Sequence, residues 1–83
     1  MQKNIYQIFY SLSKANKDSA RMKISEHTGI TIGTIAIHWL SSKEGIPDKH
    51  KDKCLEIFTT ILQDQIDGYQ KLINLKKEKN VNT

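Results

Sequence analysis

The sequence has few of the residues that cross-links, membrane spans and secretion signals require. Its 83 residues include one cysteine, so no internal disulfide can form. A lone cysteine in an apolar pattern, here Cys54, is typical of a buried thiol in a reducing compartment, and we expect a cytoplasmic protein. No apolar run approaches the roughly 20 residues of a membrane-spanning helix. The N-terminus also lacks the apolar core of a signal peptide, so we expect no membrane partner.

Recognisable catalytic and metal-binding motifs are missing as well. The sequence shows no Ser/His/Asp arrangement, no paired carboxylates and no glycine-rich phosphate loop. We therefore predict no enzymatic activity, no cofactor and no small-molecule ligand. Among the three histidines, only His50 has a cysteine, Cys54, on the same helix face, which makes half of a zinc site at most. Because no second cysteine supports this pair, we predict no metal.

Basic residues are in excess in only one half of the chain. The formal net charge is +4. Residues 1–43 carry six basic side chains against two acidic ones, whereas residues 44–83 carry seven of each. A localised basic excess favours a polyanionic partner such as nucleic acid, although a solvated surface has the same composition.

Helix breakers are few, with one proline and four glycines, and the apolar residues recur at helical spacing. Asp18 or Ser19 would cap the second helix and Thr31 the third. The predicted helices cover 4–15, 19–28, 32–42, 48–67 and 69–78, with Gly68 as the interruption before the last. We expect an all-α fold, a small single domain of four or five helices over residues 1–78 with a long C-terminal helix. Residues 79–83 would form a frayed tail.

One stretch alternates at first like a strand: GITIGTIAIHWL, residues 29–40. The alternation changes parity at Gly33, and no other segment offers a partner strand. An unpaired strand would leave its backbone groups without hydrogen-bond partners. As a helix, the stretch places Ile32, Ile35 and Trp39 on one inward stripe. Burying such side chains, at ~1.5–3 kcal/mol each, outweighs their modest helix propensity, and we predict a helix.

The residues before and within this helix predict a helix-turn-helix motif over about 19–42. The pattern is RMKISEHTGITIGTIAIHWL, in which Ser25 stands at the close crossing, Gly29 makes the turn and Ile35 anchors the second helix. Followed by GIPDKH, it resembles the Cro/repressor-like helix-turn-helix proteins of phages over residues 19–50. The resemblance implies a sequence-specific DNA-binding transcriptional regulator, a phage-type repressor of operator DNA in a bacterial or phage-infected cell.

In that family the second motif helix enters the major groove of double-stranded DNA. The resemblance and a helical wheel direct five residues toward the bases: Thr31, Gly33, Thr34, Ile37 and Ser41. Hydroxyl groups donate or accept, glycine permits close approach, and isoleucine contacts a thymine methyl group. Because the face has no Arg, Gln or Asn, burial or a protein contact stays open for Ile37. We expect phosphate contacts from the basic residues around the motif: Lys17, Arg21, Lys23, Lys43 and Lys49.

Regulators of this kind usually bind DNA as two-fold dimers. The long helix has more apolar residues than the first helix and the motif need. We predict a homodimer interface at Leu62, Ile66, Tyr69, Leu72 and Ile73, with packing back on the first helix as the alternative. The alternative function is a small helical protein-interaction module, such as an antitoxin, an anti-defence inhibitor or an adaptor, on the same scaffold.

Overall fold

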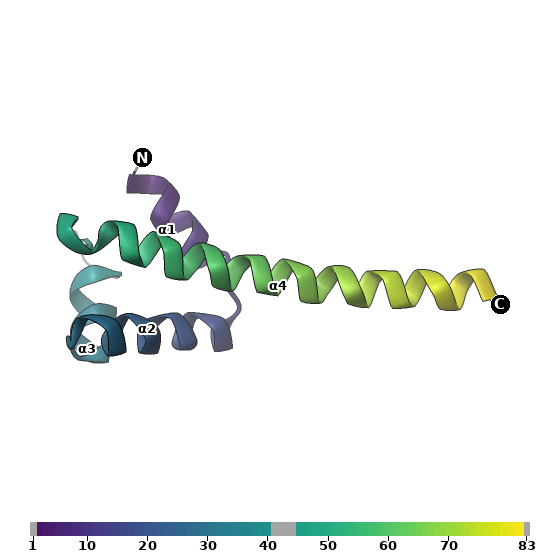
Figure 1. Ribbon diagram of the computed structural model, residues 1–83, viewed down its shortest axis with the longest axis horizontal. Helices are drawn as coiled ribbons and strands as arrows, with labels where there is room; N and C mark the ends of the chain where they lie inside the picture. The colour runs from purple at the N-terminus through teal and green to yellow at the C-terminus, as the bar shows by residue number, and fades with distance from the viewer. Residues whose placement is uncertain (1, 41–44, 83) are drawn as a thin grey trace.

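The structure, a computed structural model, describes the backbone of residues 2–40 and 45–82 and the side chains of 5–40 and 45–76. All regular structure in these ranges is helical, which confirms the all-α prediction (Figure 1). The elements are α1 (Gln2–Tyr10), α2 (Lys14–Thr28), α3 (Ile32–Thr34), the π-helical turn η1 (Ile35–Trp39) and α4 (Asp48–Asn82). Because η1 follows α3 without a break, the described chain forms four helices.

The long helix α4 organises the fold. In Figure 1, α1 and α2 lie on different sides of the first half of α4, and α3 lies beside the end of α2. The second half of α4 projects beyond the other helices, and the molecule measures 53 × 25 × 18 Å. The helix-turn-helix therefore lies at the end of the molecule opposite the C-terminus.

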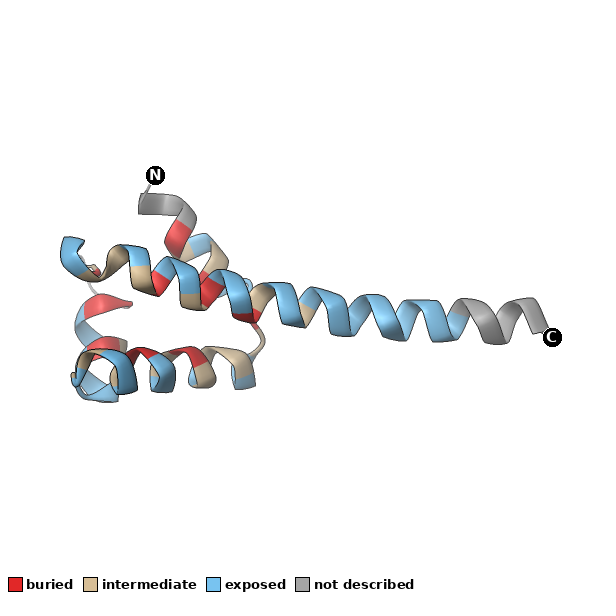
Figure 2. Cartoon of the chain, in the orientation of Figure 1, coloured by how far each residue is buried: buried red, intermediate tan, exposed pale blue. Residues whose placement is uncertain are grey.

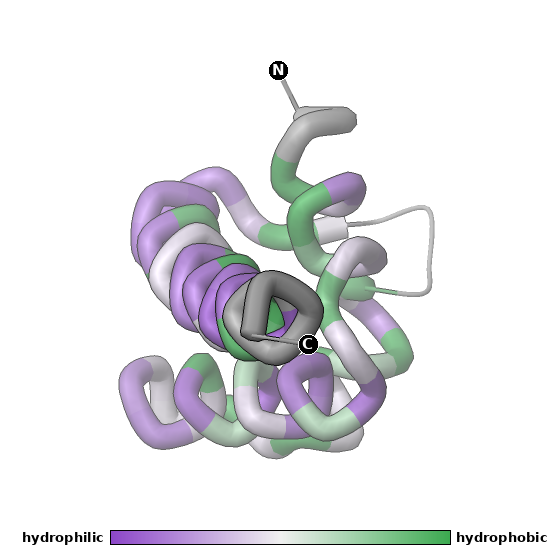
Figure 3. Tube along the Cα trace, turned by 90° about the vertical axis from the view of Figure 1, so that its right-hand side faces the viewer, coloured by the Kyte–Doolittle hydropathy of each residue, from purple (hydrophilic) through white to green (hydrophobic). Residues whose placement is uncertain are grey.

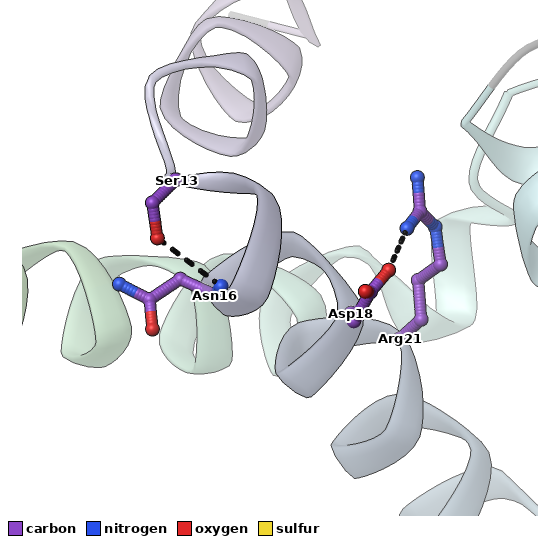
Figure 4. Close-up of polar contacts among 4 residues, drawn as sticks. All are labelled: Ser13, Asn16, Asp18 and Arg21. Atoms are coloured by element: carbon purple, nitrogen blue, oxygen red, sulfur yellow. Dashed lines mark hydrogen bonds and ion pairs between the residues drawn. The ribbon is translucent and has the colours of Figure 1, made fainter.

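The first two helices meet earlier in the sequence than predicted. α1 ends at Tyr10 instead of residue 15, and α2 begins at Lys14 instead of residue 19. Ser13 is the N-cap, because its Oγ accepts a hydrogen bond from the backbone N–H of Asn16 at 3.2 Å (Figure 4). Asp18 and Ser19 therefore lie inside α2, and neither caps it.

Gly68 does not interrupt the long helix, so the predicted separate helix at 69–78 is wrong. α4 runs from Asp48 to Asn82, and the backbone of 79–82, predicted as a tail, continues it. A glycine costs a helix about 1 kcal/mol relative to alanine, which is less than breaking the backbone hydrogen bonds on both sides. Side-chain hydrogen bonds one turn apart, Gln63 to Asp67 and Gln70 to Asn74, flank the glycine on either side.

The core lies between α1, α2, η1 and the first half of α4 (Figure 2). Phe9 and Phe58 meet at its centre with ring centroids 5.2 Å apart, and both are almost fully buried. Cys54 is buried as predicted, and burial raises the pKa of its thiol to about 11. The other buried side chains are Ile5, Leu12, Ala20, Ile24, Ile35, Trp39, Leu40, Ile46 and Ile61. Met22 is 51% exposed, because it lies on the far side of α2 from the buried Ala20 and Ile24.

Candidate nucleic-acid interface

The turn of the motif has the predicted glycine geometry. Gly29 has φ +77°, in the left-handed region that suits glycine, and its N–H donates to the carbonyl of Ser25 at 2.8 Å. The Thr28 hydroxyl donates to the carbonyl of Ile24 and accepts the N–H of Ile30. These bonds end α2 and redirect the chain, so that α2 contacts both α3 and η1.

Two threonine hydroxyls define the start of the second motif helix. Thr31 is the predicted N-cap: its Oγ1 accepts the backbone N–H of Thr34 at 3.3 Å. The Thr31 hydroxyl also donates to Oγ1 of Thr34 at 2.9 Å. Because Thr31 uses its proton in this bond, the Thr34 hydroxyl keeps its own proton for a further partner. The pair therefore presents a donor from Thr34 on an exposed helix end.

Ile32 does not face inward as predicted. Its side chain is 44% exposed, whereas Ile30, in the turn, packs against the core. The hydrogen bonds of the Thr28 hydroxyl in the turn orient Ile30 toward the core. Ile32 follows in the first turn of α3, which is exposed. The inward stripe of the motif is therefore made by Ile30, Ile35 and Trp39.

The second motif helix is wider than a regular α-helix. In η1 the N–H of Leu40 donates to the carbonyl of Ile35 at 3.1 Å, an i to i+5 bond. This bond places one more residue in the turn. Trp39 and Leu40 consequently both reach the core beside Ile35, at 6% and 4% exposure. The Tyr10 hydroxyl donates to the carbonyl of Leu40 at 2.7 Å, which ties the end of this turn to α1.

The outer surface of this helix is open. Ile37 is 63% exposed, so the burial alternative for this residue is wrong, and a base or a protein contact stays possible. A Cβ added at Gly33 would meet no atom within 4 Å, so a partner can approach the backbone there. Ser41 and Lys43, predicted to contact DNA, lie outside the described residues. The described base-reading candidates, Thr31, Gly33, Thr34 and Ile37, are all exposed.

The predicted phosphate contacts on α2 fall on two flanks of the helix. Lys17 and Arg21 lie against α1: the Lys17 amine is 5.6 Å from the centroid of Tyr10, and the Arg21 guanidinium is 5.2 Å from that of Phe9. Arg21 also donates to Asp18 at 2.9 Å (Figure 4). At 100° per residue, Lys23 is roughly 160° around the helix from Arg21. Because α2 starts at Lys14, Lys17 is the one member of the predicted phosphate set on α2 that belongs to its first turn.

Among the described members of the predicted phosphate set, Lys23 and Lys49 are exposed, whereas Lys17 and Arg21 are half-buried. Neither Lys23 nor Lys49 makes an ion pair within the described part of the chain. Lys49 lies in the first turn of α4, next to an ion pair between Lys51 and Asp48 at 2.7 Å.

A contact that sequence reasoning missed joins the motif to α4. The rings of Trp39 and His50 stack with centroids 5.2 Å apart and planes 24° apart. The spacing of His50 and Cys54 had suggested only half a zinc site, and no sequence signal indicated a stacking partner for Trp39. This stack holds the first turn of α4, with Lys49, next to the second motif helix.

The predicted dimer residues lie at the border of the core and beyond it. Leu62 packs partly against the core. Ile66, Tyr69, Leu72 and Ile73 are between 48% and 63% exposed. The alternative prediction, that these side chains pack back on α1, is therefore wrong for all but Leu62.

No protein-family model matches the chain, and neither a curated protein nor a solved structure shows significant similarity to it. Within the described ranges, no helix has both the length and the apolar character needed to cross a bilayer. The geometry of the motif and of α4 is thus the basis for the proposals below.

Proposed function

We propose that the protein is a sequence-specific DNA-binding transcriptional regulator of the phage-repressor type, which binds operator DNA as a homodimer. The main observation is the exposed start of the second motif helix, where Thr31, Gly33, Thr34 and Ile37 are exposed beside the buried Ile35 and Trp39. A helix presented in this way fits the major groove, with the residues of its N-terminal half toward the base edges.

Three of these residues have geometry that suits a specific contact with the major groove. The Thr34 hydroxyl, with its proton uncommitted, would donate to a major-groove acceptor such as guanine O6 or N7. Gly33 would let the backbone approach the groove closely. Ile37 would pack on a thymine methyl group.

Phosphate contacts would come from Lys17, Lys23 and Lys49, and they would fix the position of the motif on the duplex. Arg21 would have to exchange Asp18 for a phosphate, so we expect a smaller contribution from it. Three such contacts per copy make six in a dimer, for which affinity falls by about 10³-fold between 50 and 200 mM salt.

The experiment that tests this proposal is a selection of bound fragments from genomic DNA, followed by titration of the recovered duplex. The Thr34→Val variant keeps the shape of the side chain and removes the hydroxyl. We expect it to lower the preference for the selected over a random duplex about tenfold, or ~1.4 kcal/mol. Lys23→Ala should weaken both duplexes alike, and Thr60→Val, an exposed position on α4, is the matched control. Equal losses on both duplexes with Thr34→Val would remove this residue from the base-reading set.

A second candidate, a helical protein-interaction module, is favoured by one specific observation. Ile32 and Ile37 expose 44% and 63% of their side chains on the outer face of the motif, which has no Arg, Gln or Asn among its described residues. Apolar side chains of this kind are common at protein interfaces. If the chain binds no duplex at about 50 mM salt, the DNA proposal fails and this candidate takes its place.

A further inference from the structure

From the edge of the core outward, α4 carries a continuous stripe of apolar side chains, which begins at the half-buried Leu62. Leu62, Ile66, Tyr69 and Ile73 follow one another at alternating steps of four and three residues. This is the spacing of a two-stranded coiled coil. The last three are 48% to 53% exposed. Figure 3, which looks nearly along α4, shows both hydrophobic and hydrophilic positions on this helix. Exposed apolar surface of this extent usually marks an interface.

The stripe continues at both ends with polar residues that restrict how it can pair. Toward the domain the next position is Thr59, and toward the C-terminus it is Lys76, both exposed. We propose that α4 pairs in antiparallel orientation with α4 of a second copy of this chain, through Leu62, Ile66, Tyr69 and Ile73. This inference rests on the homodimer of the proposed function and not on DNA binding itself.

The antiparallel register fills every apolar layer. In antiparallel coiled coils the two kinds of core position face each other, so Leu62 lies opposite Ile73 of the second copy and Ile66 opposite Tyr69. The two-fold axis repeats both layers, which gives four consecutive apolar layers. The next layer on each side joins Lys76 to Thr59 of the second copy. No charged side chain then faces its own copy.

A parallel pair would meet an electrostatic cost that the antiparallel pair avoids. In parallel orientation Lys76 would lie opposite Lys76 of the second copy, so two like charges would meet at the end of the apolar stripe. In antiparallel orientation Lys76 comes within one helical turn of Glu56 of the second copy. Glu56 is exposed and contacts only Lys53, at 3.5 Å, within the described residues. The charge distribution along α4 therefore favours antiparallel pairing.

This orientation also suits the binding of one duplex by both copies. The interface stripe lies at roughly a right angle to the buried stripe of Cys54, Phe58 and Ile61, as 100° per residue requires. The two-fold axis of an antiparallel pair is perpendicular to the plane of the two helices, so both domains lie on the same side of that plane. Leu72, which continues the buried stripe beyond the domain, faces this side as well and would lie toward the domain of the second copy.

Cysteine cross-linking tests the orientation without touching the apolar layers. The variants are Thr59→Cys and Lys76→Cys, each in the full chain, where the buried Cys54 does not compete. In the antiparallel pair, position 59 lies opposite position 76, while like positions are about 25 Å apart along the axis. A disulfide needs Cα atoms less than about 7 Å apart. We expect an equal mixture of the two variants to form a covalent heterodimer on oxidation, and each variant alone to stay uncross-linked.

Two outcomes would overturn the pairing. A covalent dimer of either variant alone would show parallel pairing, and a monomeric parent protein by sedimentation would show that the stripe binds something other than a second copy. DNA binding is measured separately on the cross-linked dimer. If that dimer forms as expected but binds no duplex at about 50 mM salt, the antiparallel pairing stands and the proposed DNA function falls.

Discussion

The two halves of α4 have the same apolar periodicity and opposite surroundings. In the first half, Cys54, Phe58 and Ile61 are at most 6% exposed because α1 and α2 cover them. In the second half, Ile66, Tyr69 and Ile73 are about half exposed. Helical periodicity therefore indicates which face of a helix will be buried, whereas the neighbouring elements decide whether the same chain buries that face.

The largest expected effect is a difference in the free energy of unfolding between substitutions in the two halves of α4. Phe58→Ala removes a ring that packs on Phe9 in the core, and we expect a loss of about 3–5 kcal/mol in the free energy of unfolding. Tyr69→Ala should change the stability of the monomer by less than about 0.5 kcal/mol. Urea denaturation at several protein concentrations measures both. Equal losses for the two variants at the lowest concentration would contradict the division of α4.

The second prediction concerns the exposed half of α4, where a substitution should change dimer affinity and leave the fold of the monomer intact. Ile66→Asp puts a charge into an apolar layer of the dimer, and we expect dimer affinity to fall on the order of 100-fold with the monomer still folded. Asn74→Asp introduces the same charge at an exposed position outside the apolar stripe, roughly 110° around the helix from its centre, and serves as its control. Sedimentation gives the dimer affinity and circular dichroism the fold. An unchanged dimer with Ile66→Asp would place the interface elsewhere.

Gln65 marks the border between the halves. Its Oε1 accepts from the backbone N–H of Ser13 at 2.7 Å and from the Asn16 amide at 2.8 Å, and its own amide donates to the carbonyl of Ser11. We expect Gln65→Ala to lower the free energy of unfolding by about 1–3 kcal/mol, since these groups would lose their partners. Gln63→Ala, two residues away at an exposed position on another face of α4, should cost little. A loss as small as that of Gln63→Ala would show that the border lies elsewhere.

The smallest effect concerns the pH dependence of the buried half. Burial raises the pKa of Cys54 from 9.0 to about 11, so the folded state holds this proton more tightly than the unfolded state does. The thiol therefore contributes full stability below pH 9, and this contribution decreases as pH rises from about 9 to 11. Denaturation curves across this window should show a steeper decline for the parent than for Cys54→Ala, which cannot titrate there. Parallel declines would contradict the burial of this thiol.

Local pattern was enough to predict much of this fold. The periodicity of the apolar residues predicted the helices, and the turn at Gly29 and the cap at Thr31 followed from residue type alone. The start of α2 could not be predicted, because Ser13, Asp18 and Ser19 are all suitable caps. The choice of Ser13 depends on Gln65, which is 52 positions further along the chain.

The candidate site was less predictable than the fold, because its geometry depends on hydrogen bonds that the helical pattern of the sequence does not show. The hydrogen bonds of the Thr28 hydroxyl in the turn decide that Ile30, and not Ile32, reaches the core. A helical wheel cannot predict these bonds. The wide turn of η1 buries Trp39 and Leu40 together, with a bond from Tyr10 to its end. These are tertiary effects, and they determine how the exposed residues are presented.

In the proposed function, two copies of the exposed motif bind one DNA duplex. The most direct measurement is the salt dependence of binding to fragments selected from genomic DNA. We expect two inverted half-sites in the selected fragments and a fall in affinity of about 10³-fold between 50 and 200 mM salt. Fragments without a shared sequence, or binding that does not change with salt, would contradict it.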